Sequence, residues 1–171
     1  MRRAALLGAV LGGVTACAPR VPEAPRFGPP SGLVGHAAPA LRGEGVDGEG
    51  AVDVGAWRGR PVVVVFFSLD CAPCAEEQPL LAWVARAAGE RARFVGVASS
   101  ASAEAVRAWR AARGGAAFPV LLDGDGALAG AFGVEGFPEH FALGADGRVR
   151  SHVRGRAPLP WLVEATGGPR R

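Results

Sequence analysis

The chain has 171 residues, of which 49% are hydrophobic and 20% are charged, enough for one domain with a hydrophobic core. Its formal net charge is only +3, and the arginines are scattered among carboxylates. This charge pattern argues against a nucleic-acid-binding protein, so no nucleic-acid partner is expected.

Residues 1–17 have the pattern of a bacterial lipoprotein signal peptide. Arg2 and Arg3 form a charged start, and the apolar stretch Ala4–Val14 is too short to span a bilayer. Val14-Thr15-Ala16-Cys17 resembles a lipobox, so we expect Cys17 to become the lipid-bearing first residue of the mature chain. The protein is then expected in the cell envelope, lipid-anchored in the periplasm or on the outer face of a membrane. An ordinary signal peptide with an incidental cysteine, or an uncleaved anchor, stays open as an alternative.

Residues 18–34 are rich in proline and glycine, which predicts a semi-extended tether ahead of a domain at residues 35–171. Early in that domain, Gly43-Glu44-Gly45-Val46-Asp47-Gly48 matches the dinucleotide-binding motif GxGxxG. No strand pattern precedes the segment, no helix pattern follows it, and it carries acidic residues where a pyrophosphate would bind. We therefore predict a turn between two short extended pieces.

The apolar run Val62–Phe67 is typical of a strand that is buried on both faces. Cys71-Ala72-Pro73-Cys74 follows it directly, and then a helical pattern in which Leu80, Leu81, Val84, Ala85 and Ala88 share one face. The two thiols therefore lie at the start of a helix. Unpaired N–H groups and the helix dipole favour an anion there, so a thiolate is stabilised.

Spacing predicts different roles for the two cysteines. Cys71 lies at the helix start and can reach solvent, whereas Cys74 lies one turn deeper and is close enough to form a disulfide with it. A redox-active dithiol is the favoured interpretation. A structural disulfide stays open, and a zinc site would need further ligands that the sequence does not supply nearby.

The remaining segments alternate between strand and helix patterns. Asp123-Gly124-Asp125-Gly126 is predicted to be a turn, because it lacks the later acidic positions of a calcium loop. This alternation predicts an α/β fold with a mixed central β-sheet and helices on both faces. We expect strands at 94–98, 119–122, 141–143 and 148–154. We also expect one helix that is capped by Ser102, a short helix that ends near Phe132 and a last helix that starts near Pro158.

These blocks resemble the thioredoxin superfamily, most closely its membrane-tethered TlpA-like group, which includes the thioredoxins of cytochrome c maturation. The resemblance covers Gly35 to about Thr166 and implies a thioredoxin-like fold. It also implies that Pro138 is a cis-proline facing the cysteines. No cofactor or resident metal is expected. The blocks that carry the resemblance are Val62–Pro79, Phe118–Asp123, Phe132–Glu139 and Asp146–Val149.

Three residues beside the predicted site are candidates for tuning the dithiol: Asp70, Glu139 and His140. Asp70 stands where the family usually has tryptophan before the first cysteine, and His140 stands where it commonly has threonine. Glu139 occurs at its position in some cytochrome-maturation members. A merely structural role stays open for His140.

The resemblance implies a thiol–disulfide oxidoreductase that acts as a reductant. Cys71 attacks a target disulfide, and Cys74 resolves the mixed disulfide. The implied partners are protein disulfides, apocytochrome c among them, and a membrane-embedded dithiol electron donor.

Two alternatives are kept. The first is a peroxiredoxin-like peroxidase, because Ser68 lies three residues before Cys71, where those enzymes have threonine. The second is a copper-binding chaperone that uses Cys71, Cys74 and either His140 or His152.

Overall fold

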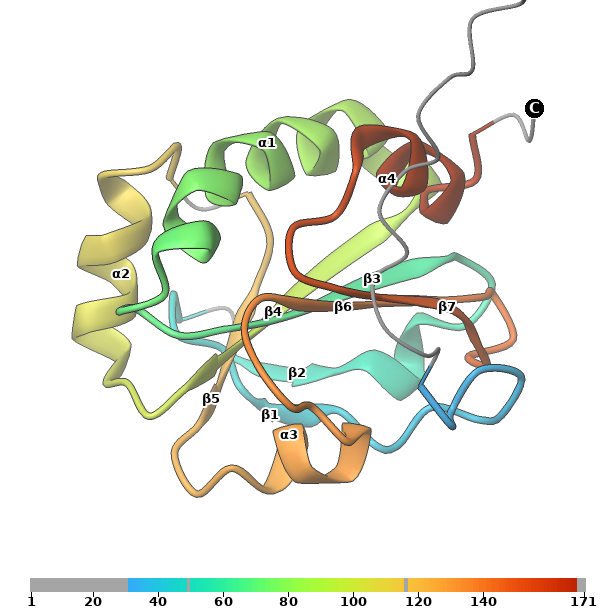
Figure 1. The fold of residues 1–171 in the computed structure, drawn as a ribbon, viewed down its shortest axis with the longest axis horizontal. Helices are drawn as coiled ribbons and strands as arrows, with labels where there is room; N and C mark the ends of the chain where they lie inside the picture. Colours follow the sequence, from blue (N-terminus) through green and yellow to red (C-terminus); the bar gives the residue numbers. More distant parts are fainter. Residues whose placement is uncertain (1–30, 49, 116, 169–171) are drawn as a thin grey trace, which may run out of the picture.

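The computed structural model describes residues 31–168 except 49 and 116, and a mixed sheet forms its centre (Figure 1). Within these residues the sheet has five strands in the order β5-β4-β3-β6-β7. β3 pairs in parallel with β4, and β4 with β5, whereas β6 is antiparallel to β3 and to β7. The strands are β3 (Val62–Phe67), β4 (Arg93–Ser99), β5 (Val120–Asp123), β6 (Glu139–Leu143) and β7 (Val149–Arg154).

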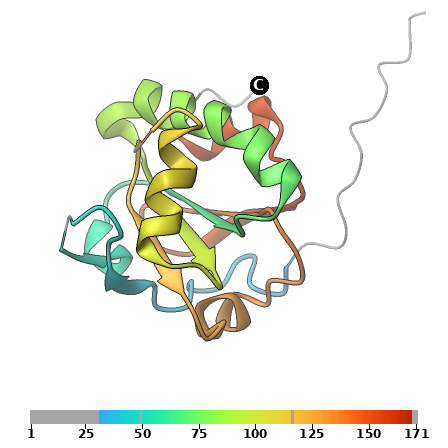
Figure 2. The same cartoon turned by 90° about the vertical axis from the view of Figure 1, so that its left-hand side faces the viewer.

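Helices cover both faces of this sheet, as predicted (Figures 1 and 2). α1 and α4 lie on one face, and α2 contributes Val106 and Trp109 to the same half of the core. α3 lies on the opposite face, where Phe132 packs. The helices are α1 (Ala72–Ala88), α2 (Ala103–Ala111), α3 (Ala127–Phe132) and α4 (Leu159–Ala165), with 3-10 turns η1 (Val54–Trp57) and η2 (Gly89–Arg91).

The apolar run of β3 is explained by its central position, since all six of its side chains are buried. Side chains alternate between faces along a strand. Val63, Val65 and Phe67 therefore join the core under α1. The alternate residues Val62, Val64 and Phe66 join the core on the α3 face. The prediction of a strand buried on both faces is confirmed.

The two glycine-rich segments that mimic ligand motifs are turns, as predicted. Gly43–Gly48 belongs to a small antiparallel hairpin of β1 (Arg42–Glu44) and β2 (Ala51–Asp53). After β5, the Asp123 carboxylate accepts hydrogen bonds from the backbone N–H groups of Leu128 and Ala129, both at 2.9 Å. It therefore satisfies amides in the first turn of α3.

The N-terminal predictions fall largely outside the described residues. The proposed signal peptide, Cys17 and the tether up to residue 30 all lie there. Leu33 and Val34, at the end of the predicted tether, pack against the core on the α3 face. Among the helices that the structure describes, none is long and apolar enough to cross a membrane.

Candidate active site

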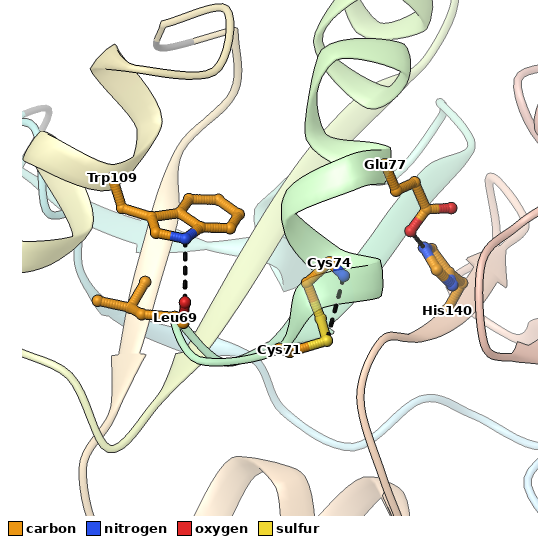
Figure 3. Close-up of a disulfide and its surroundings, with 6 residues drawn as sticks. All are labelled: Leu69, Cys71, Cys74, Glu77, Trp109 and His140. Atoms are coloured by element: carbon orange, nitrogen blue, oxygen red, sulfur yellow. Dashed lines mark hydrogen bonds and ion pairs between the residues drawn. A yellow bond between two sulfur atoms is a disulfide. The ribbon is translucent and has the colours of Figure 1, made fainter.

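The two cysteines lie where β3 leads into α1, and they form a disulfide with an S–S distance of 2.08 Å (Figure 3). Cys71 is the N-cap residue of α1, and its Sγ accepts a hydrogen bond from the Cys74 backbone N–H at 3.1 Å. Pro73 lies in the first turn, where its missing N–H leaves no intrahelical bond unmade. The Cys71 sulfur therefore faces the unpaired amides and the positive end of the helix dipole, both of which stabilise a thiolate.

The exposure of the two cysteines differs. Cys74 is only 3% exposed and packs in the core under α1, whereas Cys71 is half-buried at the edge of that core. An attacking partner sulfur can therefore reach Cys71 more readily than Cys74. The predicted difference in exposure is confirmed, and the roles predicted from it stay a prediction.

The peptide bond between Phe137 and Pro138 is cis. Pro138 immediately precedes β6, whose first residue Glu139 pairs with Phe66 of β3. The end of β3 leads to Cys71, so Pro138 lies at the same end of the sheet as the disulfide. Phe137 is 36% exposed, which leaves an apolar ring available at this end.

His140 lies on the α1 side of the sheet and is fully buried. Its Nε2 is 3.1 Å from Oε2 of Glu77, which is on α1 three residues after Cys74 (Figure 3). The contact is within ion-pair distance but does not meet hydrogen-bond angles, so neither ring nitrogen of His140 has a hydrogen-bond partner among the described residues. The other carboxylate oxygen of Glu77 accepts from the Ala157 backbone N–H at 2.5 Å.

Glu77 is the site residue that the sequence reasoning missed. Its spacing held the signal, because a residue three positions after Cys74 and four before Leu81 lies on the buried stripe of α1. A carboxylate on such a stripe is costly unless it has a partner or a chemical role. The contact of Glu77 with His140 therefore places a buried carboxylate and an imidazole against the first turns of the helix that carries the dithiol.

Glu139, although adjacent to His140, points to the opposite face of the sheet, as alternation along a strand requires. Its carboxylate accepts hydrogen bonds from the Glu135 backbone N–H at 2.9 Å and from Nε of Arg154 at 3.0 Å. Nε2 of His152 lies 2.7 Å from the same carboxylate, and Nδ1 of His152 accepts from the Ser31 backbone N–H at 3.2 Å. Glu139 is therefore not brought together with the cysteines.

The ligand set of Cys71, Cys74 and His152 that a copper chaperone could use is not assembled, because His152 belongs to this network on the α3 face. Across the described part of the chain, no group of three or more His, Cys, Asp or Glu side chains is arranged to hold a metal ion.

Asp70 lies in the exposed loop directly before Cys71. A hydrogen bond from the Ser68 hydroxyl lowers the pKa of the Asp70 carboxyl below its usual value, and a hydrogen bond from the backbone N–H of Asp70 acts in the same direction. A negative charge therefore stands in solvent beside the nucleophile. Ser68, the residue that motivates the peroxidase alternative, is engaged with this carboxylate.

Trp109 of α2 fixes the same loop from the other side (Figure 3). Its indole N–H donates to the Leu69 carbonyl oxygen at 3.1 Å, and its ring stacks on Phe67 at 5.3 Å between centroids. From the sequence, the spacing of Val106 and Trp109 predicts only that they point the same way from their helix. Its contact with Leu69 ties α2 to the loop that carries Cys71.

Comparison with known proteins matches this geometry. The redoxin family model matches residues 33–160. The solved structure of MTB DsbF is 27% identical with a TM-score of 0.67, and the alignment covers 74% of this chain and 92% of that one.

Two further solved structures are similar. A secreted Mycobacterium tuberculosis disulfide oxidoreductase homologous to Escherichia coli DsbE is 25% identical with a TM-score of 0.63, covering 74% of this chain and 94% of that one. The exposed lipoprotein thioredoxin Etrx1 of Streptococcus pneumoniae is 21% identical with a TM-score of 0.67, covering 75% and 98%. At that identity the last likeness shows the fold alone.

Proposed function

From the premise that the chain belongs to the Redoxin family and is a thioredoxin-like thiol–disulfide oxidoreductase, we propose that it is an exported, membrane-tethered reductant of protein disulfides. The observation that carries this proposal is the asymmetric cysteine pair at the start of α1, with Cys71 accessible and Cys74 buried. Exported proteins with oxidised cysteines, apocytochrome c among them, are the substrates we infer.

The reaction passes two electrons from the reduced protein to the substrate. The Cys71 thiolate attacks one sulfur of the substrate disulfide, so that a mixed disulfide forms and the other substrate sulfur leaves as a thiolate. Cys74 loses its proton and attacks Sγ of Cys71. The reduced substrate is released, and the Cys71–Cys74 disulfide remains. A membrane-embedded dithiol then reduces that disulfide.

Two further parts of the site support this sequence of steps. The backbone before Pro138 lies at the end of the sheet that carries the dithiol, where an extended substrate segment can pair with it. Glu77 and His140 contact one another beside the first turn of α1, and we assign them the proton that leaves Cys74 during resolution. In this proposal Cys71, Cys74 and Pro138 contact the substrate, and the Glu77–His140 pair is buried one helix turn beyond Cys74.

Export and tethering are supported by the lipobox resemblance at Cys17. One of the similar proteins described above is secreted, which supports export. If Cys17 carries the anchor, Cys17→Ser abolishes partitioning into detergent. Retention of the variant in membranes after a high-salt wash would show instead that the apolar segment Ala4–Val14 is the anchor.

The reductant assignment is tested by the reduction potential of the Cys71–Cys74 pair, measured by equilibration with glutathione. We expect a value nearer the roughly −270 mV of thioredoxin than the roughly −120 mV of the strongest oxidants of this fold. A value at the oxidising end would reverse the direction of the reaction.

The roles of the two cysteines are tested by trapping. Cys74→Ala should accumulate mixed disulfides with partner proteins and Cys71→Ala should not, and equal trapping by both would overturn the assigned roles. Consumption of peroxide at a comparable rate would favour the peroxidase alternative.

A further inference from the structure

At the end of the sheet opposite the disulfide lies a cavity of about 240 Å³, which the redox chemistry does not use. Its walls include three arginines, Arg42, Arg58 and Arg60, together with Trp57 and Asp53. We call it the arginine pocket. Val62 and Leu143, where β3 begins and β6 ends, also line it, so it lies at the far end of the two strands that lead to Cys71 and Pro138.

The arginine pocket has excess positive charge. Neither Arg42 nor Arg58 has a carboxylate partner within the residues that the structure describes. Arg60 forms an exposed ion pair with Glu90. The single acidic residue in the wall, Asp53, caps η1 by accepting a hydrogen bond from the Gly55 backbone N–H at 2.8 Å. Two guanidinium groups are therefore available to an incoming anion.

Arg58 lies against the neighbouring turn at Gly147. Gly147 has a φ of +73°, and a Cβ built on it would overlap the Arg58 guanidinium. The guanidinium thus lies directly against the backbone of Gly147. A hydrogen bond from the Gly59 N–H to the Ala145 carbonyl, at 2.9 Å, joins the segment that carries Arg58 to that turn. A side chain at position 147 would therefore force the Arg58 guanidinium to move.

Planar guanidinium groups pair best with the oxygens of phosphate or carboxylate, and arginine is preferred where two oxygens are held at once. We propose that the arginine pocket binds the phosphate of an anionic phospholipid headgroup. The choice of lipid rests on the proposed function, because a lipid-anchored domain spends its time within reach of a membrane surface. The tether before residue 31 is long enough for this, since about 13 extended residues span roughly 40 Å.

This binding would orient the enzyme. β3 starts in the wall of the arginine pocket and runs for six residues, about 20 Å, toward the disulfide. With the pocket on the bilayer, Cys71 and Cys74 face the aqueous side, where exported substrates are found. The domain must release the headgroup before its dithiol can meet a membrane-embedded donor.

The test is co-flotation of the full chain carrying Cys17→Ser with vesicles. Vesicles of phosphatidylglycerol and phosphatidylcholine are compared with vesicles of phosphatidylcholine alone, so that any contribution of the N-terminal apolar segment cancels. We expect preferential binding to the anionic vesicles. Arg42→Gln combined with Arg58→Gln should weaken it about 25-fold, since each arginine near an anionic surface contributes about 5-fold.

Two controls distinguish binding in the arginine pocket from a general attraction between positive charge and the vesicles. Arg86→Gln combined with Arg91→Gln removes the same net charge away from the pocket and should change binding less than 3-fold. Gly147→Ala keeps the net charge but displaces Arg58, and it should weaken binding by about 5-fold. Equal losses in the two double variants, or wild-type binding by Gly147→Ala, would overturn the proposal.

Competition by soluble glycerol phosphate at the same phosphate concentration as the vesicles would also overturn the lipid assignment. Reduction of a soluble disulfide substrate should be unchanged in all these variants, which confirms that they are folded. If the Cys17→Ser chain itself fails to reduce the soluble disulfide, that result counts against the proposed function and not against the lipid site.

Discussion

β6 carries a histidine–carboxylate contact on each of its faces, and the two contacts are built differently. On the α3 face, Glu139 is bonded to Glu135, Arg154 and His152, and His152 uses its second ring nitrogen as well. On the α1 face, Glu77 and His140 touch at 3.1 Å without hydrogen-bond geometry, and both ring nitrogens of His140 lack hydrogen-bond partners among the described residues.

The difference sets a fully satisfied network apart from the pair to which we assign a role in the reaction. A fully satisfied buried network fixes the chain around it, because each group has a preferred partner. An incompletely satisfied pair stabilises the fold less but can exchange a proton with a neighbour. The pair of Glu77 and His140 is the one beside Cys74, whereas Glu139 and His152 hold together β6, β7 and the chain at Ser31.

The largest expected effect comes from breaking the satisfied network. Glu139→Ala leaves Arg154 and His152 without their buried acceptor, and the free energy of unfolding should fall by about 3 kcal/mol. Urea denaturation monitored by circular dichroism measures this. Disulfide exchange per folded molecule should stay within about 3-fold of the parent. A stable variant with slow exchange would mean that Glu139 acts on the dithiol after all.

The second experiment removes the carboxylate on the other face. Glu77→Gln takes away the proton acceptor assigned to Cys74, so the rate of resolution of a mixed disulfide should fall about 100-fold. Stopped-flow measurement with a mixed disulfide preformed on Cys71 isolates that step. The free energy of unfolding should change by less than about 1 kcal/mol. A stability loss as large as that of Glu139→Ala, without a change in rate, would make the two contacts equivalent.

The smallest effect concerns Asp70, which sharpens the comparison because its carboxylate is exposed. Its pKa is lowered by the Ser68 hydroxyl, so it stays ionised throughout the range in which a thiol titrates. Its negative charge disfavours a thiolate at Cys71. Asp70→Asn should therefore lower the pKa of the Cys71 thiol, and screening should keep the change below about one pH unit. Thiolate absorbance of reduced Cys74→Ala protein measures this, and an unchanged or raised pKa would show that Asp70 points away from the sulfur.

The fold and the dithiol could be predicted from the sequence because their signals are local. The apolar run of β3, the CxxC spacing and the caps at Cys71 and Ser102 each lie within a few residues. Glu77 was missed because Glu-Glu-Gln in a helix also fits a solvated face. The spacing of Glu77 from Cys74 and Leu81 points to the buried stripe of α1, and in the structure Glu76 is exposed and Glu77 is buried.

The remaining features depend on contacts between segments far apart in the sequence. Glu139 and His140 are adjacent in the sequence, and both are candidates for tuning the dithiol. The pleat of β6 places their side chains on opposite faces of the sheet. The arginine pocket combines residues near 42, 58 and 147, which no periodicity connects. Such sites form only when the turns at the end of a sheet come together.

The hydrogen bond from Trp109 to Leu69 has an optical consequence. An indole fixed beside the loop that leads into a disulfide is exposed to quenching by electron transfer to that disulfide. Of the four tryptophans in the chain, Trp109 is the one hydrogen-bonded to the loop before Cys71. Its emission should therefore rise when the Cys71–Cys74 bond is reduced, and Trp109→Phe should diminish the rise. The protein then reports its own oxidation state without a label, so electron transfer from a donor or to a substrate can be followed as it happens.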